Sequence, residues 1–259
     1  MKVVILAGGL GSRISEESYL KPKPMIEIGE QPILWHIMKE YSHYGFNEFI
    51  ICLGYKGYKI KEYFNDYYLY TSDVTFDLKH NKMITHNSHS EDWKVTLVDT
   101  GIKTFTAGRL KRIQKYIGNE PFMLTYGDGV SDINIKELVK FHKSQDKLAT
   151  ITAYNYGQRF GVVVTNDNDE VVSFREKRAA DGSFINAGYM VFEPEVFNEL
   201  PEDCDNVMLE DILEKLANER KLSAYKHKGF WFGMDTQRDK KQLEEMWNTG
   251  NAKWKTWED

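Results

Sequence analysis

The chain has 259 residues, which is long enough for one α/β domain to bury a core without disulfides or a structural metal. Hydrophobic residues make up 41% and charged residues 28%, and no apolar run approaches the roughly 20 residues that a membrane-spanning helix needs. The formal net charge of −5 provides no basic surface for general nucleic-acid binding. We therefore expect neither a nucleic-acid nor a membrane partner.

The two cysteines, Cys52 and Cys204, stand alone, without C-x-x-C spacing or a histidine pattern beside them. A disulfide framework is thereby excluded, and buried structural thiols are favoured. The N-terminal apolar stretch before Gly8 is too short for the apolar region of a signal peptide. We expect it to form a buried first strand, in a cytoplasmic protein.

The first part of the chain alternates apolar runs with helical patterns, joined by short turns. The apolar runs predict strands at 2–7, 48–53, 94–98, 122–126 and 148–154. Apolar residues three and four positions apart predict helices at 31–41, 58–67, 109–117 and 135–144. This order indicates an α/β fold, a Rossmann-like and mostly parallel sheet flanked by helices.

The pattern changes after about residue 155. Short apolar runs predict strands at 162–164, 171–174 and 189–192, which suggest a mixed or antiparallel extension of the sheet. Two further helices are predicted at 209–220 and 237–247. Because there is no linker or repeat, we expect a single domain over residues 1–259.

Residues 70–94 are polar and carry His80, His86 and His89. The spacing of these histidines is compatible with a metal site, but a solvated loop or a subunit contact is favoured.

The segment Leu6-Ala7-Gly8-Gly9-Leu10-Gly11-Ser12-Arg13 directly follows the first predicted strand. Glycines at such a turn allow backbone N–H groups to face an anion. A P-loop is disfavoured because no lysine stands at the required spacing, and a dinucleotide-binding motif because Ile14 occupies its third glycine position. A triphosphate-binding loop that ends in Arg13 and a plain glycine turn both remain open.

A second motif, Lys21-Pro22-Lys23-Pro24-Met25, follows shortly after the glycine loop. Its two prolines restrict the backbone to an extended conformation. The two lysines are placed to reach the same phosphates as the glycine loop, and an exposed basic turn is the alternative.

Together, these two motifs resemble the sugar-1-phosphate nucleotidyltransferase family. Further similar segments are Tyr126-Gly127-Asp128-Gly129, Phe174-Arg175-Glu176-Lys177, Phe184-Ile185-Asn186-Ala187-Gly188 and Phe232-Gly233-Met234-Asp235-Thr236. Residues 33–38, 95–101, 106–112 and 254–258 are similar to the cytidylyltransferase branch of this family.

The resemblance implies a reaction in which CTP and α-D-glucose 1-phosphate give CDP-glucose and pyrophosphate, by Mg²⁺-assisted in-line attack on the α-phosphorus. It also implies a homo-oligomer such as a hexamer, with the stretch 63–76 as a candidate interface, and a role in precursors of surface polysaccharide such as O-antigen. UTP or dTTP in place of CTP, another sugar 1-phosphate, and a non-catalytic regulatory module on the same fold are alternatives. A dinucleotide-dependent oxidoreductase is more remote.

The resemblance also assigns residues to roles, with a nucleotide-binding half over 1–155 and a sugar-phosphate-binding half over 156–259. It implies that Arg13, Lys23 and Asp128 are catalytic and that Asp128 and Asp235 hold Mg²⁺. The implied nucleotide-binding residues are Leu6, Ala7, Gly8, Gly9, Leu10, Gly11, Ser12, Arg13, Lys23, Thr104, Arg109 and Asp128. The implied sugar-phosphate-binding residues are Gly161, Glu176, Lys177, Asn186 and Gly188.

Overall fold

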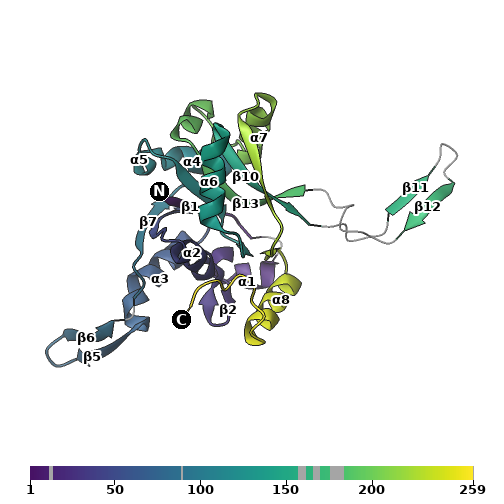
Figure 1. Cartoon of the computed structure of the whole chain (residues 1–259). Helices are drawn as coiled ribbons and strands as arrows, with labels where there is room; N and C mark the ends of the chain where they lie inside the picture. Colours follow the sequence, from purple (N-terminus) through teal and green to yellow (C-terminus); the bar gives the residue numbers. More distant parts are fainter. Residues whose placement is uncertain (12–13, 89, 157–161, 166–169, 176–183, 259) are drawn as a thin grey trace.

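The computed structural model describes residues 1–11, 14–88, 90–156, 162–165, 170–175 and 184–258. At its centre is a seven-stranded sheet in the order β14-β10-β13-β8-β1-β4-β7 (Figure 1). In chain order the strands are β1 (Val3–Ala7), β4 (Glu48–Leu53), β7 (Lys94–Asp99), β8 (Phe122–Tyr126), β10 (Ala149–Asn155), β13 (Phe184–Phe192) and β14 (Leu222–His227). Only β13 runs antiparallel to its neighbours, so the predicted mostly parallel sheet is confirmed.

Both faces of this sheet are covered, which explains why its strands read as continuous apolar runs. In β1, Val3, Ile5 and Ala7 face one core, whereas Val4 and Leu6 face the other. The first core is completed by helices α2 (Ile33–His43), α3 (Gly57–Tyr70), α6 (Ile135–Gln145) and α8 (Gln237–Asn248). The second is completed by α4 (Thr106–Arg112), α5 (Gln114–Ile117) and α7 (Leu209–Asn218).

Strand β13 connects the two halves of the chain. It lies between β8 and β10, although it follows both in sequence. The first and second halves therefore share one sheet, and the assignment of one ligand to each half stays a prediction.

The predicted helix at 109–117 was wrong in its extent. The structure places two helices there, and α4 begins three residues earlier than predicted, at Thr106. Backbone N–H groups of Phe105 and Ala107 donate to the carbonyl oxygens of Asp205 and Val207. Because these acceptors are distant in sequence, apolar periodicity gives no sign of where α4 begins.

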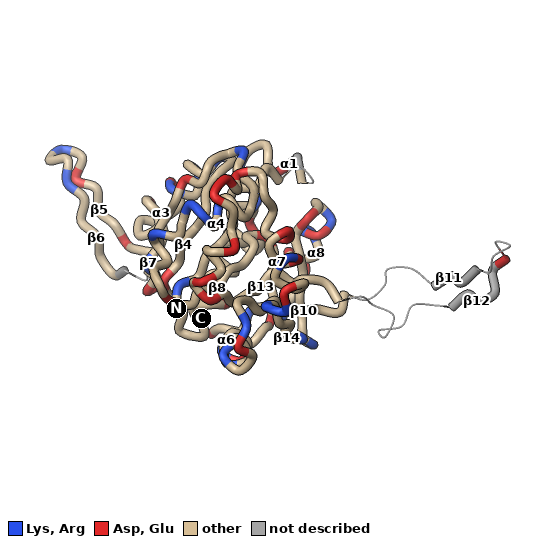
Figure 2. Tube along the Cα trace, turned by 90° about the horizontal axis from the view of Figure 1, so that it is seen from above, with Lys and Arg blue, Asp and Glu red and all other residues tan. Residues whose placement is uncertain are grey.

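A hairpin occupies most of residues 70–94, so the expected solvated loop is wrong, whereas the alternative of a subunit contact stays a prediction. Strands β5 (Ser72–Asp77) and β6 (Lys82–Ser88) pair antiparallel and project from the body in both views (Figures 1 and 2). The predicted strands near 162–164 and 171–174 form a second antiparallel hairpin, β11 (Val162–Thr165) and β12 (Val171–Arg175). This hairpin is a separate two-stranded sheet, so of the three strands predicted to extend the central sheet only the last, within β13, belongs to it.

Four neighbouring parallel strands, β1, β4, β7 and β8, end at the same edge of the sheet. Just beyond β8, the short strand β9 (Gly129–Ser131) pairs with β15 (Trp231–Gly233). Ligands of open α/β sheets bind at this carboxyl edge, so a ligand site is expected there. Among the described residues, no helix combines the length and apolarity needed to cross a membrane.

Candidate active site

A cavity of about 670 Å³ opens at the carboxyl edge of the sheet. Most of its lining comes from the glycine loop, the segment around α4 and the turn after β8, and four further residues come from the Lys23-Pro24 turn, Met208 and Asp235. Among the described residues, the lining consists of Leu6, Ala7, Gly8, Gly9, Leu10, Gly11, Lys23, Pro24, Ile102, Lys103, Thr104, Phe105, Thr106, Arg109, Tyr126, Gly127, Asp128, Met208 and Asp235. Every described residue that the sequence analysis assigned to the nucleotide or the metal is among them.

The glycine loop follows β1 without a side chain at three of its first four positions. A Cβ atom at Gly8 would overlap the Arg109 guanidinium, and Gly11 has a φ of +63° that disfavours other residues. The loop therefore needs glycine at both places. Ser12 and Arg13 lie outside the described residues, so their predicted roles stay predictions.

Arg109 holds the ends of three strands together beneath this loop. Its guanidinium donates to the carbonyl oxygens of Leu53 at 2.9 Å and Gly8 at 3.0 Å, and to the Thr100 hydroxyl at 2.8 Å. The side chain is buried, and burial lowers the pKa of Arg109. Arg109 lines the cavity, and in this structure its donors bind backbone and hydroxyl oxygens of the protein, so its predicted contact with the nucleotide stays a prediction.

Lys23 lies between the two aspartates that the sequence assigned to a metal. Its Nζ is 2.6 Å from Asp128 Oδ2 and 2.8 Å from Asp235 Oδ1. Lys23 begins a 3₁₀ turn, Lys23–Met25, in which Pro24 fixes the backbone, and it is 9% exposed. The structure thus brings these three residues together, and their predicted roles toward the triphosphate and the metal stay predictions.

The β9–β15 ladder brings the two aspartates together. Gly129 pairs with Gly233, and the Met234 N–H donates to the Asp128 carbonyl oxygen at 2.8 Å. Asp128 precedes β9 and Asp235 follows β15, so antiparallel pairing places their side chains at the same end of the ladder.

These two carboxylates fit a hard divalent cation. They already converge on one positive group, the Lys23 ammonium, and Mg²⁺ is commonly held by one or two carboxylates together with substrate phosphates. Across the described part of the chain, no group of three or more histidine, cysteine or acidic side chains is placed to hold a metal. A metal at this site would therefore complete its coordination with oxygens of water or of the substrates.

The sugar-phosphate residues are only partly described. Gly161, Glu176 and Lys177 lie outside the described residues. Asn186 Oδ1 accepts a hydrogen bond from the Gly188 N–H at 2.9 Å, and Gly188 has a φ of +85°. A Cβ at Gly188 would lie 2.7 Å from the Tyr126 ring, so this turn packs against a residue that lines the cavity.

Sequence reasoning missed part of the cavity wall. Tyr126 lines the cavity and donates its hydroxyl proton to Glu210 Oε1 at 2.6 Å, and Met208 lies on the same wall. Burial raises the pKa of Tyr126 well above its usual range, so this phenol stays neutral. Tyr126 belongs to the segment Tyr126-Gly127-Asp128-Gly129, from which only Asp128 was predicted as a site residue. No sequence pattern indicated Met208 or Glu210.

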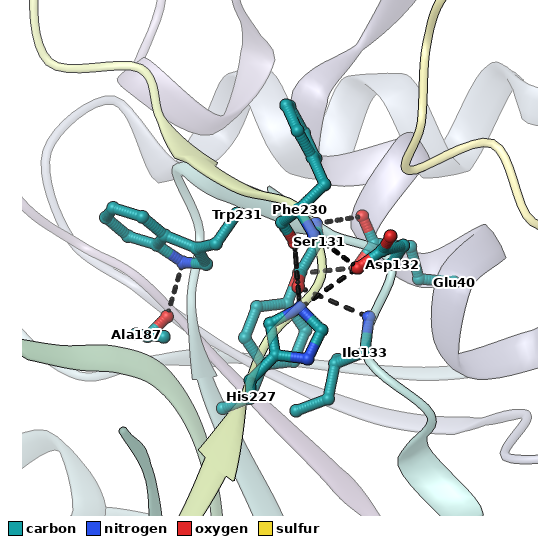
Figure 3. Close-up of polar contacts among 9 residues, drawn as sticks. Glu40, Ser131, Asp132, Ile133, Ala187, His227, Phe230 and Trp231 are labelled. Atoms are coloured by element: carbon teal, nitrogen blue, oxygen red, sulfur yellow. Dashed lines mark hydrogen bonds and ion pairs between the residues drawn. The ribbon is translucent and has the colours of Figure 1, made fainter. Parts of the chain in front are cut away.

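Ser131, Asp132 and His227 meet near the site, as in a hydrolytic triad (Figure 3). One ring nitrogen, His227 Nε2, lies 3.0 Å from Asp132 Oδ1 and 3.4 Å from Ser131 Oγ, whereas a triad uses opposite nitrogens for these contacts. Ser131 Oγ also donates to the Phe230 carbonyl oxygen at 2.7 Å, and Ser131 is buried. This cluster holds backbone segments in place and presents no nucleophile.

Comparison with known proteins agrees with this geometry. The chain is 52% identical to glucose-1-phosphate cytidylyltransferase of Salmonella typhimurium, over the full length of both, and 43% identical to a probable glucose-1-phosphate cytidylyltransferase of Bacillus subtilis, over 99% of this chain and 100% of that protein. Among solved structures, a putative glucose-1-phosphate thymidylyltransferase from Bacillus anthracis has the same fold, with a TM-score of 0.72 at 18% identity, covering 100% of this chain and 98% of that one. A UDP-glucose pyrophosphorylase complexed with UDP-glucose gives a TM-score of 0.67 at 17% identity, covering 96% and 98%.

A family model described as nucleotidyl transferase matches residues 2–259, nearly the whole chain. The glycine loop, the Lys23–Asp128–Asp235 cluster and the shared fold are consistent with that match. The chain belongs to the nucleotidyl transferase family.

Proposed function

We propose that this nucleotidyltransferase uses CTP and α-D-glucose 1-phosphate and forms CDP-glucose and pyrophosphate. The observation that carries the choice of substrates is the 52% identity, over full length, to a glucose-1-phosphate cytidylyltransferase. The product is an activated sugar suited to the synthesis of surface polysaccharide. A cytoplasmic location is part of the proposal, because CTP is available to an enzyme inside the cell.

The reaction exchanges one phosphorus–oxygen bond for another. A phosphate oxygen of glucose 1-phosphate attacks the α-phosphorus of CTP, and the bond from that phosphorus to the β-phosphate oxygen breaks, so the electron pair leaves with pyrophosphate. The protein supplies position and compensating charge rather than a covalent partner. In the proposal, Arg13 and Lys23 bind the leaving phosphates and Lys177 binds the sugar phosphate.

The proposed metal is Mg²⁺, held by Asp128 and Asp235. When bound there, it would offset negative charge where two phosphate-bearing substrates meet. Lys23 now holds both carboxylates, so its ammonium is already beside the place where the phosphates are expected. Metal binding between the aspartates would free this lysine for the triphosphate.

A pyrophosphate-release assay over all pairs of four nucleoside triphosphates and several sugar 1-phosphates tests the substrates. We expect CTP with glucose 1-phosphate to give the highest kcat/KM. A preference for UTP or dTTP would contradict the proposed base. Faster pyrophosphate release with another sugar 1-phosphate would contradict the proposed acceptor. No release with any pair would favour a non-catalytic module.

We further propose that the chain forms a homo-oligomer through the β5–β6 hairpin. Leu78 at its tip is 88% exposed, and Phe76 and Ile84 are exposed on its strands. Apolar side chains on a projecting hairpin are covered in many assemblies by another copy. Sedimentation of the Leu78→Glu variant and of the wild type tests this, because the variant should have the smaller assembly mass. The same assembly mass for the two proteins would contradict the proposed interface.

A further inference from the structure

A buried carboxyl group that the proposed reaction does not use contacts strand β9, which directly follows the proposed metal ligand Asp128. Glu40 belongs to α2 and is 2% exposed. An isolated buried carboxylate is costly, and among the described residues no cation pairs with Glu40. The burial of this carboxyl group without a cation must therefore be explained by its protonation state and its hydrogen bonds.

Both carboxyl oxygens of Glu40 have partners near strand β9 (Figure 3 shows Glu40 beside Ser131). Oε1 accepts a hydrogen bond from the Ser131 N–H at 3.1 Å. Oε2 makes a short contact with the Tyr189 hydroxyl, which lies 3.1 Å from the Gly129 carbonyl oxygen. Glu40 thus contacts the last residue of β9 directly and its first residue through Tyr189.

The count of protons available to the linked groups Glu40, Tyr189 and Gly129 indicates that the Glu40 carboxyl group is neutral. The Tyr189 hydroxyl has a single proton, and the Gly129 carbonyl oxygen can only accept. If the Tyr189 hydroxyl donates its proton to the Gly129 carbonyl oxygen, its own oxygen can only accept a hydrogen bond from a protonated Glu40 Oε2. Burial raises the pKa of Glu40 well above its usual range, and the nearby Asp132 acts in the same direction.

Strand β9 is the segment whose position decides where the Asp128 carboxylate lies. Asp128 immediately precedes β9, and β9 pairs with β15, which precedes Asp235. On the other side, Asp132 Oδ1 accepts from the Phe230 N–H at 2.6 Å, which fixes the segment before β15. Glu40 completes these restraints from the side of α2.

We propose that Glu40 is a positioning residue, a neutral carboxyl group that holds β9 through Ser131 and Tyr189 and so sets Asp128 opposite Asp235. This inference rests on the proposed metal role of the two aspartates. Because the carboxyl group is neutral, an amide of the same shape should replace it: Gln accepts from Ser131 and donates to Tyr189.

The test compares Glu40→Gln, Glu40→Leu and Tyr189→Phe with the wild type, all as full chains. Mn²⁺ binding by electron paramagnetic resonance, without substrates, gives a Kd that does not depend on turnover. Activity adds the Mg²⁺ concentration for half-maximal rate and the KM for CTP. Leu34→Ala, another buried position on α2, controls for simple loss of stability.

We expect Glu40→Leu to weaken Mn²⁺ binding about tenfold and to raise the half-maximal Mg²⁺ concentration similarly, because it leaves the Ser131 N–H without its acceptor. Glu40→Gln should stay within about threefold of the wild type on both measures. Tyr189→Phe should be intermediate. Leu34→Ala should lower the melting temperature without changing either metal constant.

Two results would overturn the inference. One is a normal Mn²⁺ Kd in both Glu40→Leu and Tyr189→Phe, which would leave Glu40 a merely structural residue. The other is a Glu40→Gln variant as impaired as Glu40→Leu, which would mean that a charged carboxylate is needed. If Glu40→Leu does not fold, a normal Mn²⁺ Kd in Tyr189→Phe, or a loss of about tenfold in Mn²⁺ affinity in Glu40→Gln, overturns the inference. Failure of the proposed function is separate, since it would show in the wild type as absence of transfer.

Discussion

Lys23 shows how one side chain stabilises a site before any ligand binds. Two aspartates whose carboxylates converge on one point repel each other. The Lys23 ammonium lies within 2.8 Å of both carboxylates and offsets this repulsion. If a metal ion and a triphosphate bind here, the metal ion would replace the ammonium beside the two carboxylates. The triphosphate would replace the carboxylates beside the ammonium.

Replacing Asp128 by Asn should leave the fold intact and lower kcat by at least about 100-fold, because an amide is a poor ligand for Mg²⁺. Asp235→Asn should behave in the same way. The loss in kcat of the double variant should be much smaller than the product of the two single losses, because both aspartates bind the same ion. Steady-state kinetics at saturating Mg²⁺ measure this.

The matched control is Asp73→Asn, an exposed aspartate on the β5–β6 hairpin, which should keep wild-type kinetics. Activity of Asp128→Asn within a few-fold of the wild type at saturating Mg²⁺ would refute the metal assignment.

Lys23 and Lys177 should affect different substrates. A charge-assisted contact is worth about 1.5–3 kcal/mol, so each loss should weaken its substrate by about tenfold or more. Lys23→Ala should raise the KM for CTP. Lys177→Ala should raise the KM for glucose 1-phosphate and leave CTP binding without sugar almost unchanged. Calorimetry of CTP binding to both variants is the direct measurement, and equal losses in the two would contradict a division into two phosphate sites.

At the scale of elements, the site depends on strand ends that are joined by one arginine. Arg109 comes from α4 and bonds oxygens at the ends of β1 and β4 and just after β7. Glycine at position 8 leaves the space that the guanidinium fills. The glycine loop is thus held from below by Arg109, whatever contacts its upper side makes with a ligand.

Gly8→Ala should raise the KM for CTP by about tenfold or more, because the added methyl group must displace the Arg109 guanidinium from its three acceptors. Its melting temperature should also fall. At Gly9, by contrast, a Cβ meets no atom within 4 Å, so Gly9→Ala should keep the wild-type melting temperature. Equal melting temperatures for the two variants would show that Arg109 does not need the space at Gly8.

At the scale of the whole molecule, the C-terminal segment closes the core beside α2. His36 of α2 is buried, with its ring centroid 4.7 Å from that of Trp247. Its Nε2–H donates to the Ile28 carbonyl oxygen at 2.8 Å, and its Nδ1 accepts from the Trp254 indole at 3.3 Å. The ring is therefore neutral, because a proton on Nδ1 would face another donor.

Burial lowers the pKa of His36 to about 4. Between about pH 6.5 and pH 4 the unfolded chain binds a proton here that the folded protein does not, so acidification through this range destabilises the fold. From pH 7.5 to pH 4.5 we expect His36 to remove about 2–3 kcal/mol of the free energy of unfolding.

Urea unfolding followed by tryptophan fluorescence, at both pH values, measures the effect. Other buried groups also titrate, and Glu40 acts in the opposite sense, so the wild type is compared with His36→Gln. The stability difference between the two proteins should move in favour of the variant by about 2–3 kcal/mol at pH 4.5. A constant difference would mean that His36 is not held neutral.

The amino-acid sequence by itself determined the α/β alternation, because strands buried on both faces and helices with one apolar face have different periods. Strands 48–53 and 122–126 have the predicted bounds, and glycine and proline motifs marked the loops that line the cavity. Only the tertiary structure decided which residues meet: Asp128 with Asp235 across β9 and β15, Arg109 beneath Gly8, and Glu40 against Ser131. These contacts depend on sheet order and strand register between distant segments, which no local period encodes.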